Sequence, residues 1–114
     1  MAIVVGLDDL RTSPTASLFE GADHGIDVSF FVVDSTPGKG PSLHVHPYPE
    51  AFVVHEGEAT VIVGDEEIVL GAGQVVVGPA DVPHRFTNTG TGRLLMTTIH
   101  AAGRTETTWL EEGE

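Results

Sequence analysis

Two histidines and a glutamate stand close together in the segment HVHPYPE, residues 44–50. On an extended strand, residues two apart point to the same face, so His44 and His46 are expected to lie side by side. The two prolines of the segment exclude a helix and let the chain turn, which brings Glu50 toward the same point. Two imidazoles and a carboxylate that face one point can bind a single ion. The segment therefore predicts three sides of a metal site.

A fourth ligand is expected from a second segment, GPADVPHRFTNTG, in which His84 begins a strand. Three neutral imidazoles and one carboxylate form a mixed nitrogen and oxygen set. Such a set suits manganese, iron, cobalt, nickel, copper or zinc better than calcium or magnesium. An octahedral ion held by four side chains keeps two positions open, and open positions are typical of a catalytic or binding site rather than a closed structural one.

The elements that must position these residues are short strands. They are rich in Val, Ile, Phe and Thr, they are separated by Gly, Pro or Asp, and no stretch has a sustained helical period. The expected strands lie within residues 27–34, 50–57, 58–64, 66–71, 73–78, 84–90 and 93–101. Gly64 and Asp65 are expected to form a tight hairpin turn. Seven or more strands at this spacing predict an all-β sandwich or barrel.

The amino-acid composition limits the kinds of molecule that we expect the protein to bind. The chain has 114 residues, about the length of one domain, with 17 acidic and 5 basic residues and a formal net charge of −12. This charge disfavours nucleic acids and anionic membrane surfaces as partners. The absence of cysteine excludes disulfides and thiolate ligands. The first ten residues contain an apolar run too short to span a membrane and no basic stretch, so we expect a soluble cytoplasmic protein.

Taken together, the two segments resemble the two motifs of the cupin superfamily, across residues 38–88. The first motif, G-x5-HxH-x3-E-x6-G, is matched by Gly38, His44, His46, Glu50 and Gly57. The second, G-x5-PxG-x2-H-x3-N, is matched by Gly73, Pro79, His84 and Asn88. Asp81 stands where the second motif has its second glycine. Aspartate tolerates the left-handed backbone conformation better than most residues, so the turn is expected to survive.

The resemblance implies a small single-domain cupin spanning residues 1–114. Its core, about residues 26–102, would be a β-barrel of two antiparallel sheets, also called a jelly roll or double-stranded β-helix. Cupins are often dimeric, and the N-terminal segment and the acidic C-terminal tail are expected to cover sheet edges or to pair with a second subunit. The family's metal lies inside the barrel, at positions matching His44, His46, Glu50 and His84.

The resemblance leaves the reaction open, because cupins include dioxygenases, isomerases, epimerases, cyclases, decarboxylases and binding domains. The favoured hypothesis is a metal-dependent enzyme, dioxygenase-like or isomerase-like or a cyclase, acting on a small, partly apolar organic substrate. The alternative is a non-catalytic module that binds or senses a small molecule or a metal. We expect one divalent ion per chain, with iron, manganese or nickel favoured over zinc, cobalt or copper, and a homodimer.

Further residues are candidates for catalysis or for the substrate pocket, because their odd or even position along an expected strand places them on its inward face. If Met96 faces inward, then so does His100, which is either a proton carrier near the metal or a strand-end histidine bonded to backbone. Glu50 is a second catalytic candidate. Phe52, Phe86 and Met96 are expected to face inward as part of the core, and as candidate walls of a substrate pocket.

Overall fold

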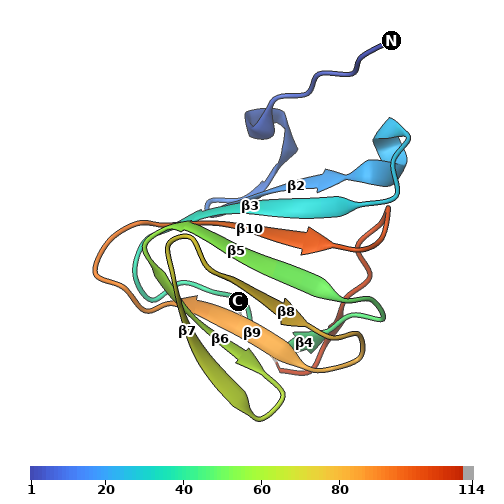
Figure 1. Ribbon diagram of the computed structural model, residues 1–114. Coiled ribbons are helices and arrows are strands. Elements are labelled where there is room, and N and C mark those ends of the chain that lie inside the picture. Colours follow the sequence, from blue (N-terminus) through green and yellow to red (C-terminus); the bar gives the residue numbers. More distant parts are fainter. Residues whose placement is uncertain (112–114) are drawn as a thin grey trace.

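The computed structural model describes residues 1–111, and strands dominate this part of the chain (Figure 1). The strands are β1 (Arg11–Ser13), β2 (Ala16–Glu20), β3 (Ser29–Ser35), β4 (His44–Val45), β5 (Glu50–Glu56), β6 (Glu58–Val63), β7 (Glu66–Gly71), β8 (Val75–Gly78), β9 (His84–Asn88), β10 (Leu94–His100) and β11 (Thr108–Trp109). Two short 3-10 helices, η1 (Leu7–Leu10) and η2 (Gly21–His24), lie near the N-terminus.

The strands form two antiparallel sheets with the core between them. The first sheet has six strands in the order β1-β2-β3-β10-β5-β8, and the second has five in the order β11-β4-β9-β6-β7. The expected all-β architecture of two antiparallel sheets is confirmed. Sequence neighbours pair in the β6–β7 hairpin, whereas β10 pairs with β3 and β5, which are distant in sequence.

Side chains alternate between the barrel interior and the outside along each strand. On β5, Glu50, Phe52 and Val54 are buried, and on β10 the buried residues include Met96 and His100. Apolar side chains from both sheets form one core cluster: Val33, Phe52, Val54, Ala59, Val61, Val63, Leu70, Phe86, Leu94 and Met96. Glu50 and His100 therefore lie on the same inward face as the apolar core.

Two turns behave as the sequence predicts. Gly64 and Asp65 connect β6 to β7, and Gly64 has a positive φ of 59°. Asp81 also adopts a positive φ, 64°, as expected for the residue that replaces the motif glycine. Its backbone N–H donates to the carbonyl of His46 at 2.8 Å. The turn of the second motif is thereby tied to the first.

Two motif residues hold the connections between strands. Gly57 joins β5 to β6 with a φ of 90°, and a Cβ at this position would lie 2.3 Å from the carbonyl oxygen of Arg93. Asn88 is buried, and its side-chain amide donates to the carbonyls of Ser35 and Gly92, each at 3.0 Å. The close backbone approach at Gly57 and the hydrogen bonds of Asn88 therefore explain why the motifs have a glycine and an asparagine at these two positions.

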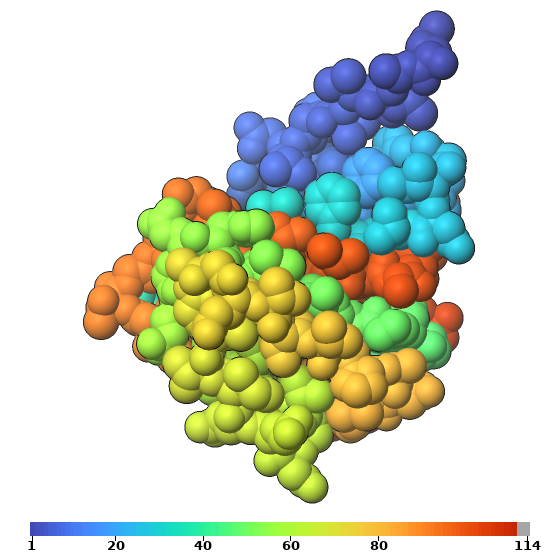
Figure 2. All heavy atoms as spheres, viewed as in Figure 1, coloured from blue at the N-terminus to red at the C-terminus, as the bar shows by residue number. Residues whose placement is uncertain are grey.

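Both ends of the described chain add to the sheets. β1 pairs with β2, and β11 pairs with β4, so each end strand joins the edge of a sheet. Residues 1–6 extend away from the barrel, with Val4 93% exposed (Figures 1 and 2). Within residues 1–111, no helix is long and apolar enough to cross a membrane.

Candidate metal centre

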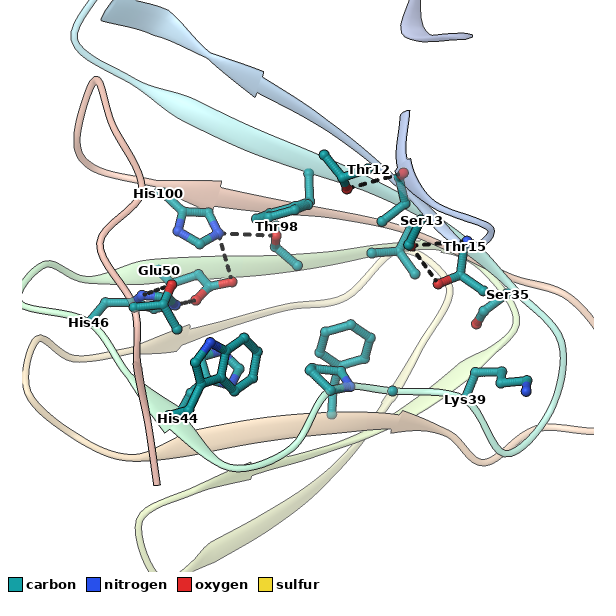
Figure 3. A pocket seen from close by; sticks show the side chains of 18 of the residues that line it. Thr12, Ser13, Thr15, Ser35, Lys39, His44, His46, Glu50, Thr98 and His100 are labelled. Atoms are coloured by element: carbon teal, nitrogen blue, oxygen red, sulfur yellow. Dashed lines mark hydrogen bonds and ion pairs between the residues drawn. The ribbon is translucent and has the colours of Figure 1, made fainter. Parts of the chain in front are cut away.

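Four side chains predicted as ligands meet inside the barrel. His44 on β4 pairs directly with His84 at the start of β9, and Glu50 begins β5. His46 follows β4. All four are buried, and one potential ligand atom from each lies within 4.8 Å of the others. The structure thus brings together the whole predicted ligand set (Figure 3 labels His44, His46 and Glu50).

The three imidazoles are oriented by backbone carbonyls. Each Nδ1 lies beside a carbonyl oxygen: His44 with Ser42 at 2.7 Å, His46 with Glu106 at 2.8 Å and His84 with Val82 at 3.2 Å. Because a carbonyl only accepts, each Nδ1 carries the hydrogen, which leaves the lone pair on Nε2. Histidines that bind metals are commonly held in this way by a partner on the other ring nitrogen.

The Nε2 atoms of His46 and His84 lie beside the carboxylate of Glu50. Glu50 Oε1 lies 3.1 Å from His46 Nε2 and 2.9 Å from His84 Nε2. These three buried atoms have no well-directed hydrogen bond to any of residues 1–111. Buried polar atoms are normally satisfied, and lone pairs that face one another repel unless a cation lies among them. The donor set and its unsatisfied atoms therefore fit a divalent first-row metal ion.

The charge states of the cluster favour metal binding. Burial would raise the pKa of Glu50, but the imidazoles of His100, His46 and His84, which can donate to the carboxylate when they are protonated, outweigh it and hold that pKa well below its usual range. Burial lowers the pKa of His44 to about 4. Near neutrality Glu50 is thus ionised and His44 is neutral, as ligands must be. Although burial opposes it, the Glu50 carboxylate, which would accept a hydrogen bond from a protonated His46, raises the pKa of His46, so a proton there competes with the metal.

His100 extends the cluster beyond the four predicted ligands, and its ring centroid lies 4.9 Å from that of His46. Its Nε2 lies 3.2 Å from Glu50 Oε2, and its Nδ1 lies 2.8 Å from the hydroxyl of Tyr48. The backbone N–H of Glu106 donates to the same hydroxyl at 3.2 Å. His100 faces inward as its parity predicts, and its partners are side chains rather than backbone. Its catalytic role stays a prediction.

Tyr48 and Trp109 take part in the site although the sequence reasoning did not assign them to it. Burial raises the pKa of Tyr48 to about 12, so its hydroxyl stays protonated. Its even spacing from His44 and His46 was a usable signal, because residues two apart on an extended segment share a face. The ring centroids of Trp109 and His44 lie 4.8 Å apart. This contact depends on the pairing of β11 with β4, in which Trp109 is opposite His44.

A cavity of about 560 Å³ opens beside the cluster. Its walls include His44, His46, Glu50 and His100, together with the apolar side chains of Phe31, Val33, Phe86 and Trp109. Of the predicted substrate walls, Phe86 lines this cavity. Phe52 and Met96 are 1% and 0% exposed in the core and do not line it, so the cavity gives their predicted role no support.

The family model for the cupin domain matches residues 31–100, more than half of the chain and the whole of the cluster. The chain belongs to the cupin family. This cupin is 47% identical over 55 residues to protein SchB of Streptomyces halstedii, and 46% identical over 55 residues to polyketide synthase CurC of Streptomyces cyaneus. Each match covers 47% of this cupin, but only 40% and 36% of those two relatives.

Solved structures show the same fold. This cupin is similar to a double-stranded β-helix protein from Klebsiella pneumoniae, with 23% identity, a TM-score of 0.76 and coverage of 98% of this chain and 100% of that chain. It is also similar to the oxalate decarboxylase of Lactobacillus farciminis, with 22% identity, a TM-score of 0.78 and coverage of 90% of this chain and 34% of that chain.

Proposed function

We propose that this cupin is a metal-dependent enzyme that acts on a small, partly apolar organic substrate inside the barrel. The observation that carries the proposal is the convergence of three imidazoles and the Glu50 carboxylate beside the cavity, which His44, His46 and Glu50 line. Iron, manganese and nickel are the first ions to test, and zinc, cobalt and copper suit the same donors. When bound, such an ion would act as a Lewis acid toward substrate oxygen atoms, or as the redox centre of a dioxygenase.

The chain's own residues would bind the substrate and move protons. Phe31, Phe86 and Trp109 line the cavity and would hold the apolar part of the substrate away from water. The depressed pKa of Glu50 makes it a weak base, which favours its role as a ligand over its predicted catalytic role. His100 is better suited to accept and return a proton, because its ring is fixed by Tyr48 and lies in the cavity wall.

The partial relatives favour an oxygen-rich substrate. One of them is named as a polyketide synthase, and polyketide-type molecules carry carbonyl or hydroxyl oxygens on alternate carbons. Two such oxygens can bind one metal ion together. This would require two coordination positions on the ion that the protein side chains leave open. Oxidation by dioxygen, isomerisation and cyclisation are the reactions that we propose for such a substrate.

The test is turnover by protein loaded with one metal at a time. Iron(II), manganese(II) and nickel(II) forms would be incubated with a 1,3-diketone or a hydroxyquinone, and oxygen uptake and substrate loss would be followed together. We expect turnover with at least one metal and none with His84→Ala. A surface variant, Glu67→Gln, serves as the control for altered charge and should retain the activity.

A non-catalytic binding or sensing module is the second candidate. It is supported by the small number of groups in the cavity lining that could act as an acid or a base. Outside the predicted ligand set, the titratable side chains that line the cavity are His100 and Lys39. Ligand binding without turnover by any metal-loaded form would favour this candidate over the enzyme.

We also propose the homodimer that the resemblance implies. On the outer face of the six-stranded sheet, Ile99, Ala51 and Val77 lie in one row across β10, β5 and β8. Ile99 is 39% exposed and Val77 is 60% exposed, which leaves an apolar surface that a second copy would cover. Sedimentation of the wild type beside Val77→Lys tests this. The cytoplasmic location remains a prediction from the sequence.

A further inference from the structure

Lys39 is the one lysine of the sequence, and it lines the same cavity as the metal cluster. The chain's other basic side chains each lie within 4 Å of a carboxylate: Arg11 beside Asp8, Arg85 beside Glu111, Arg93 beside Asp34 and Arg104 beside Asp23. Lys39 has no such partner among residues 1–111, although the chain is strongly acidic. A cation left unpaired in so acidic a protein is available for a ligand.

The backbone fixes where the Lys39 side chain begins. Asn88 on β9 donates its N–H to the Lys39 carbonyl at 2.8 Å, and its own carbonyl accepts from Gly38 at 2.8 Å. The next residue, Gly40, lies so close to β9 that a Cβ there would be 2.0 Å from the carbonyl oxygen of Phe86. The segment that carries Lys39 is therefore anchored to the same strand that supplies Phe86 to the cavity.

Ser35 lies at the same end of the cavity as Lys39 (Figure 3). It is 5% exposed, and its hydroxyl has no hydrogen-bond partner among the described residues. Buried hydroxyls normally find a partner. Ser13 and Thr15 also line the cavity, so hydroxyl groups accompany the ammonium group of Lys39.

The polar end and the metal cluster are far apart. Ser35 pairs with Leu94 at one end of β10, whereas Glu50 pairs with His100 at the other end. Leu94 and His100 are six positions apart along the strand, which corresponds to about 20 Å. Apolar side chains, among them Phe31, line the cavity between the two ends. A ligand that reaches both ends must be elongated and apolar in its middle.

We infer that the cavity binds an elongated organic acid, with its anionic group at Lys39 and Ser35 and its chelating oxygen atoms at the metal cluster. This inference rests on the proposed function and specifies its substrate class. A formal charge of −12 repels anions at a distance, so a local cation is needed to hold one. An ammonium group and a hydroxyl both donate hydrogen bonds to a carboxylate, and the charge strengthens the first of these.

A matched pair of elongated ligands tests the inference. The acid is 9,11-dioxododecanoate, in which a chain of methylene groups separates a chelating 1,3-diketone from the carboxylate, and its neutral counterpart is dodecane-2,4-dione, which has the same diketone but no carboxylate. Chelation by a metal shifts the ultraviolet absorption of both. Manganese-loaded wild type, Lys39→Met, Lys39→Arg and Ser35→Ala would be titrated with each ligand. Arg85→Met, which removes a positive charge outside the cavity, is the control.

We expect Lys39→Met to weaken binding of the acid by roughly tenfold and to change binding of the neutral ligand less than about twofold. Lys39→Arg should restore most of the affinity, Ser35→Ala should weaken the acid selectively, and Arg85→Met should resemble the wild type. An equal effect of Lys39→Met on both ligands, or on neither, would overturn the inference while the absorption shift upheld the metal site. Binding of the acid that depends on Lys39 but shifts no absorption would support the anion site at Lys39 but would contradict chelation at the metal cluster, and with it the proposed function.

Discussion

Glu50 and His100 face each other directly across β5 and β10, with Glu50 Oε2 lying 3.2 Å from His100 Nε2. The other carboxylate oxygen, Oε1, lies beside His46 and His84. One carboxylate therefore joins the predicted metal ligands to a histidine that stands outside them. Strand pairing sets this geometry, because both residues are held in register within one sheet.

Replacing Tyr48 by phenylalanine should reduce the free energy of unfolding by about 1–3 kcal/mol. The change removes the hydroxyl that contacts His100 Nδ1 and accepts from the N–H of Glu106, and both groups would lose a partner. Urea denaturation measures the loss. The control is Thr97→Val, which removes an exposed hydrogen bond to His55 and should cost less than about 0.5 kcal/mol. Equal losses in the two variants would contradict a structural role for the Tyr48 hydroxyl.

Two motif glycines provide a second comparison. Gly57 and Gly73 both have positive φ angles, 90° and 84°. A Cβ at Gly73 meets no atom within 4 Å, whereas at Gly57 it would lie 2.3 Å from the carbonyl of Arg93. Gly73→Ala should therefore cost only the backbone strain, about 1–2 kcal/mol. Gly57→Ala should cost at least about 2 kcal/mol more, because backbone must shift. Thermal unfolding of both variants measures this difference, and equal losses of stability would show that the close approach at Gly57 has no effect.

Much of the barrel could be predicted because its central strands are short and alternate regularly. The segment 58–64 followed by 66–71 gave the β6–β7 hairpin, since Gly64 supplies a positive φ between two β-rich runs. The convergence of His44, His46, Glu50 and His84 also followed from motif spacing. In contrast, no strand was expected at β11, although the tail was expected to cover a sheet edge or to pair with a second subunit. Two residues carry no periodic signal, and they pair only where β4 offers an edge.

Parity predicts the face of a strand but not the depth along the barrel. Phe52 and Met96 face inward as expected, yet they lie in the core, while Phe86 reaches the cavity. Tyr48 and Glu106 are 58 residues apart, and their contact depends on how the tail crosses the barrel. The position of Lys39 at the far end of the cavity likewise depends on pairing between distant segments.

The metal-free protein should lose stability as the pH falls below neutrality, in part through His44. Burial lowers the pKa of His44 from 6.5 to about 4 in the folded chain, so the unfolded chain takes up this proton first. His44 therefore leaves the free energy of unfolding at its full value above pH 6.5 and reduces it as the pH falls from 6.5 toward 4. With chelator present, wild type should lose more unfolding free energy than His44→Gln between about pH 7.5 and about pH 5. Identical pH dependence in the two proteins would contradict burial of a neutral His44.

Removing metal should leave the barrel folded. The core is built from apolar side chains of both sheets, such as Phe52, Val61 and Met96, and the cluster lies beside it. Chelation should lower the melting temperature, because a ligand that binds only the folded state stabilises it. The far-ultraviolet circular dichroism at room temperature should not change. Loss of the strand signal on chelation would mean that the ion, rather than the core, holds the sheets together.

The most direct test of the metal centre is elemental analysis of protein purified without chelators or metal-affinity resin. Wild type should contain about one iron, manganese or nickel ion per chain, since the four ligands form one site. Glu50→Gln and His84→Ala should lose most of this metal, while the exposed control Glu67→Gln should keep it. Full metal content in either ligand variant, with the control unchanged, would contradict the assignment of His44, His46, Glu50 and His84 as the metal site.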